Sequence, residues 1–459
     1  MKIKLNKRMI LCIILYIGLI ISVISMPSFI TLGYSIVFIG ITTFLNFSSI
    51  VERDYVANSF FISLPILISA FQNIYLGLGA NKLNSITMQV LLTISIAVIV
   101  STVFIGILSN KFISKDFTWL IVSSIIIILQ SIILLAVFPT TIAAYLSSMR
   151  NILSPLLIFF FSVYSFKNVD LNRVYKYFSL IIFVILIFGV IEYVVGNSIW
   201  SSLNIKQLWA LKGMPIENRI VPGNWYSSEL VGGNQLRRMV STFADPVNLG
   251  SFLFAAYMFA WYFDKKILQI GLLISFVLSV SKGAFLSFLV FVIVFSWIKD
   301  RTKIFGIFGL VISTIAGGIF YLFSQSSSYG SMNAHIDGFL SALSIPIHYP
   351  LGMGVGSVGV LASKLGSEAA LSSEVLETGI GMIIAQLGFV GVIIYATFFI
   401  KLSSFGKKFK EKNDKIMWFT LLYGFLANAM FNEVALSPNS CALYFIMLGM
   451  LYNKINNEC

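Results

Sequence analysis

The sequence predicts an all-α polytopic membrane protein with about 12–14 transmembrane helices. Of its 459 residues, 58% are hydrophobic and only 11% are charged, with a mean hydropathy of +0.93, whereas a soluble protein carries about a quarter charged residues. Apolar runs of about 17–24 residues recur from end to end, and each can cross a hydrocarbon core of ~30 Å as a helix. No Pro- or Gly-rich linker separates them, so residues 1–459 are expected to form a single integral membrane domain.

Hydropathy places about fourteen candidate spans along the chain. The first, at 9–26, is long and lacks a small-residue cleavage site, so it is expected to be a membrane span rather than a signal peptide. The others are expected at about 33–50, 59–77, 86–108, 117–138, 150–166, 177–196, 246–263, 267–281, 283–298, 304–323, 377–400, 416–432 and 440–452. The two expected spans on either side of Lys282, 267–281 and 283–298, are short, so the boundary between them is the weakest of the set.

The distribution of basic residues predicts the orientation in the membrane. With the amino terminus in the cytoplasm, 22 of the 31 basic residues fall on the cytoplasmic side, which agrees with the positive-inside rule and with both termini being cytoplasmic. Two long polar segments, 197–245 and 324–376, are then extracytoplasmic loops. The basic cluster 401–415 is expected to anchor the topology near anionic lipid. The net charge of +13 therefore does not indicate nucleic-acid binding.

Metal and cofactor chemistry is not expected. The three cysteines are scattered, two of them within apolar runs, and the two histidines, His335 and His348, do not form a metal-binding pair.

The basic residues on the outer side need a specific reason to be there. Arg237, Arg238 and Lys282 fall at span boundaries, Arg150 at the outer start of its span, and Arg219 in the first long loop. Each alone could extend to lipid headgroups. If they converge, they predict a cationic pocket for phosphate or diphosphate.

Three carboxylates accompany these cations. Asp245 precedes Pro246, as a helix cap precedes a proline in the first turn, so capping competes with a direct chemical role. Glu374 and Glu377 come before an apolar run, where they would either favour the helix dipole or act as a general base.

The segments at 236–400 resemble the superfamily of O-antigen polymerases and O-antigen ligases. The first motif of that superfamily matches Arg238, Ser241, Thr242, Phe243, Pro246, Val247 and Gly250, with Ser and Val in place of Gly and Asn. Its Ser-Arg-Gly is similar to Ser281, Lys282 and Gly283, and its Pro-Leu-x-Gly-x-Gly to "PLGMGVG" (350–356). Glu377 stands where the ligases carry a histidine, eleven residues before Gly388, which favours a Wzy-type polymerase over a ligase.

The resemblance implies a glycosyltransferase of GT-C-type architecture in the bacterial cytoplasmic membrane, with two large extracytoplasmic loops. It implies undecaprenyl-diphosphate-linked glycans as donor and acceptor, and a chain-length regulator as an expected partner. Arg238, Arg237, Lys282, Arg150 and Arg219 would stabilise the departing diphosphate. Glu377, or else Asp245 or Glu374, would accept the proton of the acceptor. A flippase for lipid-linked oligosaccharides is the main alternative, beside a ligase or a scaffold.

Overall fold

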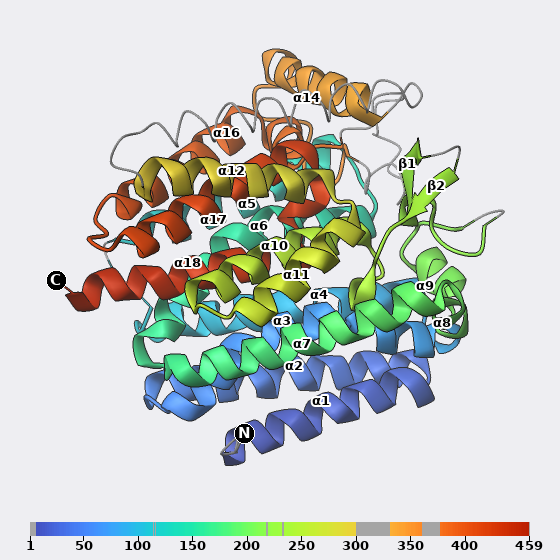
Figure 1. The fold of residues 1–459 in the computed structure, drawn as a ribbon, viewed down its shortest axis with the longest axis horizontal. Coiled ribbons are helices and arrows are strands. Elements are labelled where there is room, and N and C mark those ends of the chain that lie inside the picture. The colour runs from blue at the N-terminus through green and yellow to red at the C-terminus, as the bar shows by residue number, and fades with distance from the viewer. Residues whose placement is uncertain are drawn as a thin grey trace.

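The computed structural model describes residues 6–112, 114, 116–216, 219–231, 234–299, 331–359 and 377–458. Its helices run side by side as a bundle (Figure 1). The amino end of the first helix and the carboxyl end of the last point to the same side of the bundle, opposite to a small β-hairpin (Figure 1). We call these two sides the terminal end and the cavity end.

Nine helices of the described chain are long and apolar enough to cross a membrane. They are α1 (Lys7–Ser25), α2 (Ser28–Val51), α3 (Tyr55–Gly79), α4 (Ser85–Leu108), α5 (Thr118–Val137), α6 (Ile142–Ser165), α7 (Leu171–Val195), α12 (Lys282–Lys299) and α16 (Gly379–Gly406). Five further long helices are α10 (Pro246–Tyr262), α11 (Lys266–Ser279), α14 (Ser331–His348), α17 (Lys412–Phe431) and α18 (Pro438–Glu458). The prediction of a multi-pass helical membrane protein is thus confirmed, while the expected span 304–323 lies outside the described residues.

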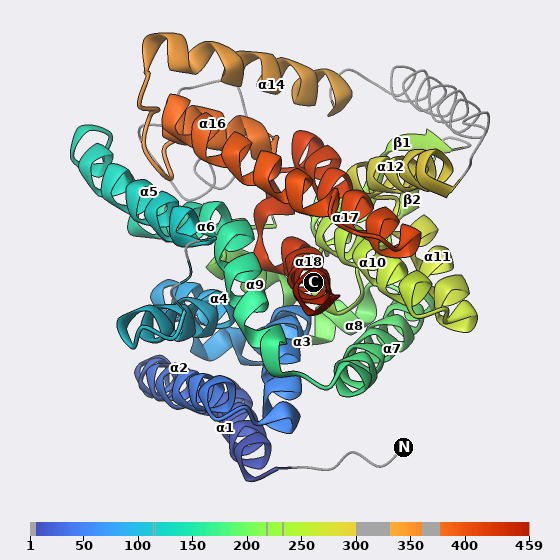
Figure 2. The ribbon, with the colours of Figure 1, turned by 90° about the vertical axis from the view of Figure 1, so that its left-hand side faces the viewer.

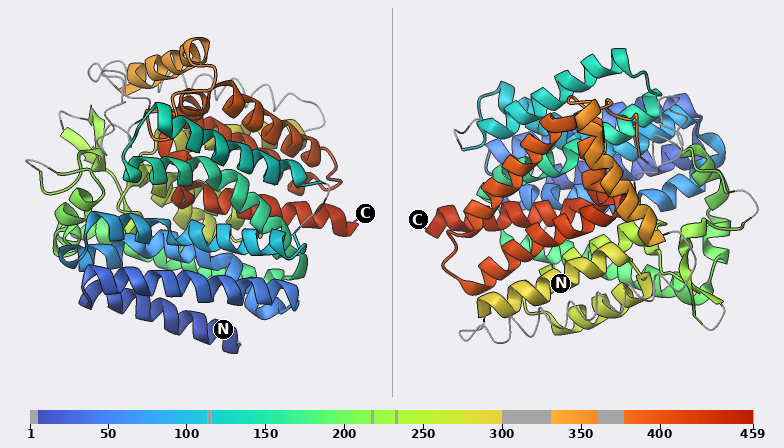
Figure 3. Two further views of the ribbon diagram at one scale, coloured as in Figure 1. Left: turned by 180° about the vertical axis from the view of Figure 1, so that it is seen from behind. Right: turned by 90° about the horizontal axis from the view of Figure 1, so that it is seen from above.

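Helix α18 occupies the centre of the bundle (Figure 2), packed against α6, α10 and α17. Its residues from Cys441 to Leu448 are almost fully buried, and α3 and α6 are also buried over most of their length. In contrast, fewer than a third of the residues of α1, α5 and α12 are buried, as expected of helices that face lipid. Helix α14 packs across α16 (Figure 3).

Polar caps begin many of these helices. The side chains of Asp54, Asn84, Thr141, Asp170 and Thr378 each accept a hydrogen bond from a backbone N–H in the first turn of the helix that follows. Such caps satisfy donors that would otherwise lack partners at a helix start. The cap positions fix where each helix begins at either end of the bundle.

Helix α16 is broken at Gly388, which has φ +60°. The glycine-rich segment 350–359 enters this break: Met353 N donates to Ala385 O at 2.9 Å, and Phe389 N donates to Pro350 O at 2.9 Å. A Cβ on Gly388 would lie 2.2 Å from Pro350 O, so glycine is required there. Residues 352–359 are therefore buried, and the segment completes the backbone hydrogen bonding of a discontinuous helix, which the membrane interior demands.

The described residues of the segment 197–245 form several short regular elements rather than an irregular loop. It contains α8 (Ser198–Ser202), α9 (Ile205–Leu211) and an antiparallel hairpin of β1 (Tyr226–Val231) and β2 (Asn234–Arg237), which pairs Tyr226 with Arg237. These elements lie together at the cavity end (Figure 1). The sequence did not predict the hairpin.

Candidate functional site

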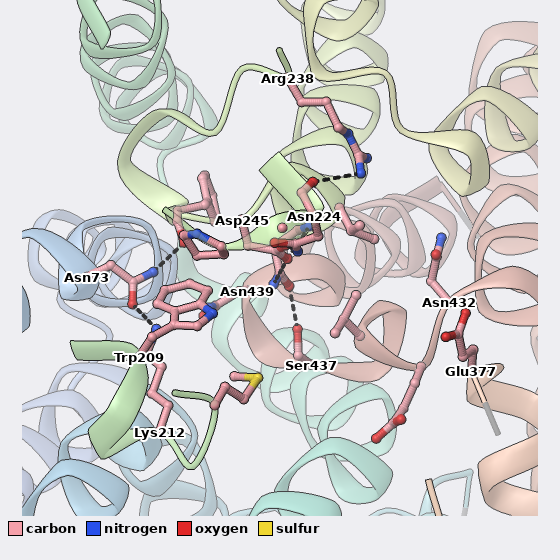
Figure 4. Close-up of a pocket in the computed structure, with 18 of the residues that line it drawn as sticks. Asn73, Trp209, Lys212, Asn224, Arg238, Asp245, Glu377, Asn432, Ser437 and Asn439 are labelled. Carbon is pink, nitrogen blue, oxygen red and sulfur yellow. Dashed lines mark hydrogen bonds between the residues drawn. The ribbon is translucent and has the colours of Figure 1, made fainter. Parts of the chain in front are cut away.

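A cavity of about 1230 Å³ opens at the cavity end, inside the ring of helix ends. Its walls come from the ends of α3, α4, α6, α9, α10, α12, α16, α17 and α18 and from the loop before α10. Figure 4 draws 18 of the lining residues and labels ten of them, Asp245 included. The charged side chains of the lining are Arg150, Lys212, Arg219, Arg238, Asp245, Lys282, Glu377 and Glu433.

Six of the eight residues singled out in the sequence line this one cavity. They are Arg150, Arg219, Arg238, Lys282, Asp245 and Glu377. Arg237 lies outside the lining, and Glu374 lies outside the described residues. Residues up to 227 positions apart in the chain, from Arg150 to Glu377, therefore share one hollow.

Arg238 is held by backbone carbonyl groups. Its Nε donates to Ser279 O at 3.0 Å, and one of its terminal nitrogens donates to Asn224 O at 3.1 Å. Its own backbone N donates to Trp225 O at 2.8 Å. These contacts tie the loop before α10 to the end of α11 and direct the guanidinium toward the cavity (Figure 4).

Arg237 points the opposite way, into an ion pair with Glu192 of α7. The Glu192 side chain has no exposed surface, and its second carboxylate oxygen accepts hydrogen bonds from Val240 N and Ser241 N, both at 3.3 Å. Arg237 was expected to bind diphosphate, but its place is structural: this pair fixes the backbone that carries Arg238. Arg237 ends β2 and Arg238 directly follows it, and successive side chains along an extended chain face opposite sides.

Asp245 is both a cap and a cavity residue. Its carboxylate accepts from Asn248 N at 3.0 Å and from Asn224 Nδ2 at 2.9 Å. Asn248 continues the network by accepting from Ser437 Oγ at 2.8 Å and Ser440 Oγ at 2.7 Å. With its oxygens used in this way, Asp245 is better placed to organise the cavity than to accept a proton.

Glu377 is adjacent to a second carboxylate that the sequence did not single out. Glu433 N donates to Glu377 O at 2.8 Å, and Glu433 lies in η5 (Glu433–Leu436), directly after α17. A Cβ on Gly359 would be 3.2 Å from Glu433 Oε2, so the glycine-rich segment closes against this carboxylate. Only the polar run "FNEVALSPN" between two apolar helices could have indicated Glu433.

Lys282 begins α12 beside the end of α17. A Cβ on Gly283 would lie 2.0 Å from Asn432 Nδ2, so a glycine there lets the two helices touch. The sequence placed Arg150 at the outer start of its span, but the structure places it further inside. Helix α6 begins at Ile142, which places Arg150 more than two turns inside it, where Nε donates to Asn151 Oδ1 at 3.2 Å.

Lys212 is, after Glu433, the second charged residue of the cavity lining that the sequence analysis did not single out. Its Nζ donates to Asn73 Oδ1 at 2.8 Å and lies 4.2 Å from the ring centroid of Trp209. Burial lowers the pKa of Lys212 to about 7, opposed by the charge of Asp245 and assisted by that of Arg150. The signal in the sequence was Trp-x-x-Lys, one helical turn apart in "LWALKG".

Within the described residues, no group of three or more His, Cys, Asp or Glu side chains is placed to hold a metal ion. The cavity is thus a site of basic, acidic and amide side chains. Comparison with protein-family models and with curated proteins finds no match to this chain.

Proposed function

We propose that this protein is a membrane glycosyltransferase with GT-C-type architecture, a polymerase of polysaccharide repeat units. It transfers the growing glycan from undecaprenyl diphosphate to a lipid-linked repeat unit at the outer face of the bacterial cytoplasmic membrane. The observation that carries the proposal is the single cavity that gathers Arg150, Arg219, Arg238 and Lys282 with Glu377. Cations that merely anchored separate helices to headgroups would have no reason to share it.

The chemistry fits this set of side chains. An acceptor hydroxyl attacks the anomeric carbon, a carboxylate takes the hydroxyl proton, and the bond between the anomeric carbon and the diphosphate oxygen breaks. The electron pair leaves on undecaprenyl diphosphate, and Arg238 and Lys282 stabilise the negative charge. Glu377 is the proposed base, and Glu433 beside it is the alternative. One displacement would invert the anomeric centre.

An apolar groove supports the lipid side of the proposal. It has a volume of about 310 Å³ and lies between α16 and α17, lined at one end by Ile380 and Leu436. Ile380 follows Glu377 by three residues, and Leu436 follows Glu433 by three. A polyprenyl chain in this groove would place its diphosphate beside the carboxylates and Lys282.

The test uses a strain from which the native gene is deleted and which is complemented with Arg238→Ala, Glu377→Gln or Glu433→Gln. General-base catalysis contributes about 10²–10⁴ in rate, so long glycan ladders should collapse to single repeats in the variant that removes the base. Arg238→Ala should have the same effect, because it removes a cation that stabilises the departing diphosphate. Lys206→Ala is the matched control, because Lys206 is exposed on α9 outside the cavity. Membrane levels of each variant are measured by immunoblot.

Long chains that persist in Arg238→Ala and in both glutamine variants would refute the proposed function. A flippase predicts a different defect, because single-repeat products on the outer leaflet would vanish as well. A ligase predicts that ladders still form on the lipid carrier but do not reach their final acceptor.

A further inference from the structure

One wall of the cavity differs chemically from the wall that carries Glu377. It is formed by α3, α4, α6 and α9, and we call it the amide wall, defined by Gln72, Asn73, Gln89, Arg150, Asn151 and Lys212. In Figure 4, Asn73 and Lys212 lie on one side of Asp245, and Glu377 lies on the other. Of this wall, the proposed function includes only Arg150, and the transfer itself is assigned to Arg238, Lys282 and Glu377.

Two buried polar atoms of the amide wall lack hydrogen-bond partners within the described residues. They are Asn151 Nδ2, a donor, and Gln72 Oε1, an acceptor. Asn151 is 1% exposed and Gln72 is 2% exposed. A buried polar group without a partner costs about 1–3 kcal/mol, so native structures leave such groups mainly where a ligand or water completes them.

The two cations of the amide wall also lack a carboxylate partner. Among the described residues, neither Arg150 nor Lys212 forms an ion pair. Arg150 donates instead to neutral acceptors, Asn151 Oδ1 at 3.2 Å and Leu92 O at 3.4 Å. Lys212 is held in place by Asn73 and Trp209. Two fixed, partly desolvated cations facing one hollow favour an oxyanion between them.

We infer that the amide wall binds a saccharide that carries an anionic group, with the oxyanion between Arg150 and Lys212 and hydroxyl groups at Asn151 and Gln72. Amide side chains can both donate to and accept from hydroxyls. The cavity of about 1230 Å³ exceeds the ~300–1,000 Å³ typical of small-molecule sites, which leaves room for sugar beside a diphosphate. This inference rests on the proposed function and names its substrate class, an acidic glycan.

The oxyanion has two possible sources, a sugar carboxylate or the diphosphate of the lipid. The experiment separates them with three soluble probes: a disaccharide containing one glucuronate, the same disaccharide with glucose in its place, and inorganic pyrophosphate. Binding to the purified full-length protein in lipid nanodiscs is measured by saturation-transfer NMR titration. The variants are Lys212→Gln, Arg238→Gln and, as the matched control on α9, the exposed Lys206→Gln.

We expect Lys212→Gln to weaken binding of the acidic disaccharide at least tenfold while leaving pyrophosphate binding within twofold of wild type. Arg238→Gln should do the reverse, and Lys206→Gln should change neither. Retained pyrophosphate binding also reports that Lys212→Gln is folded. Equal binding of the two disaccharides, no binding of the acidic one to wild type, or a tenfold loss of pyrophosphate binding in Lys212→Gln would each overturn the inference. The polymerase proposal fails separately, through ladder formation by Arg238→Ala and by both glutamine variants.

Discussion

The two ends of the bundle treat their charges differently. At the terminal end, four basic side chains pair with carboxylates of the chain itself: Arg8 with Glu52 and Asp54, Arg173 with Asp170, Lys266 with Asp264, and Lys454 with Glu411 and Asp414. At the cavity end, Arg237–Glu192 is the ion pair resolved among the described residues, and five basic against three acidic side chains line the cavity. The terminal end therefore holds most of the resolved ion pairs, whereas the cavity end concentrates basic side chains around one hollow.

This difference separates charges that hold the fold from charges that face a hollow. A helix end near the membrane surface can pair its cations with neighbouring carboxylates, as Arg8, Arg173 and Lys454 do. A cavity that binds an anion must leave cations uncompensated, at some expense in stability, because a protein carboxylate would compete with the ligand. Arg237, which forms an ion pair, and Arg238, which lines the cavity, are adjacent in the chain.

The largest effect should follow from breaking the one buried pair at the cavity end. Glu192→Ala leaves Arg237 without its partner and removes the acceptor for Val240 N and Ser241 N. Loss of one partner of a buried pair costs about 3–5 kcal/mol. The measurement is the temperature at which the purified protein loses its monodisperse peak in detergent.

Glu192→Gln is the matched control, since its amide oxygen still accepts from the backbone and only the charge is lost. We expect a smaller decrease in stability for it than for Glu192→Ala. If Glu192→Ala were as stable as wild type, the pair would not anchor the segment that carries Arg238.

A smaller loss is expected at the terminal end, at Asp414. Its side chain is 1% exposed, accepts from Tyr262 Oη at 2.7 Å and lies 2.8 Å from Lys454 Nζ. Asp414→Ala should cost about 1–3 kcal/mol, because Lys454 keeps Glu411 at 2.8 Å. Glycan ladders should remain intact in Asp414→Asn. Loss of ladders at normal protein level would mean that the terminal end also serves the reaction.

Much of this architecture follows from the sequence alone. Spans were placed from apolar runs, and most helices begin within about five residues of them, whereas α6 and α7 begin earlier than expected. Apolar runs locate helices because helical spans satisfy their own backbone in lipid. Arg238, Lys282, Asp245 and Glu377 could be singled out because polar residues are costly at span boundaries. Their presence in one cavity follows from the alternating direction of the spans.

The features of the site that could not be predicted from the sequence depend on which residues become neighbours in the folded protein. Arg237 and Arg238 look alike in "LRRM", and only the strand pairing with Tyr226 sends them apart. In the sequence little distinguishes Lys212 from other loop lysines, because its contacts with Asn73 and Trp209 form only in the folded protein. The glycines at 352–359 stood out as a motif, but their burial in the break of α16 depends on a helix about 30 residues further along the chain.

A pH titration sharpens the comparison at the cavity end. The pKa of Lys212 is lowered from 10.5 to about 7, with burial as the main cause and with Asp245 and Arg150 acting in opposite senses. Lys212 is therefore charged below pH 7 and neutral above it. Affinity for the glucuronate disaccharide should be highest below pH 7 and fall by as much as about tenfold per pH unit as the pH rises to 9.

The same lowered pKa has a consequence for folding, because the unfolded chain takes up a proton at Lys212 between pH 7 and 10.5. Its contribution to stability should therefore rise with pH across that window. Lys212→Gln should flatten both profiles. A wild-type affinity that stays constant from pH 6 to 9 would mean that Lys212 does not contact the anion.

The smallest effect is expected at Lys266 and Asp264, which pair at 2.9 Å but are 72% and 80% exposed. Exposed pairs contribute little, because water and salt screen them. Lys266→Ala should therefore leave both the thermal midpoint and the glycan ladder unchanged, in contrast to Asp414→Ala at the same end of the bundle. A clear drop in the midpoint for Lys266→Ala that disappears when both proteins are measured in 0.5 M salt would show that ion pairing itself stabilises the terminal end. If no drop is seen, the stability of that end comes from buried side chains, and the contrast between the two ends rests on buried charges alone.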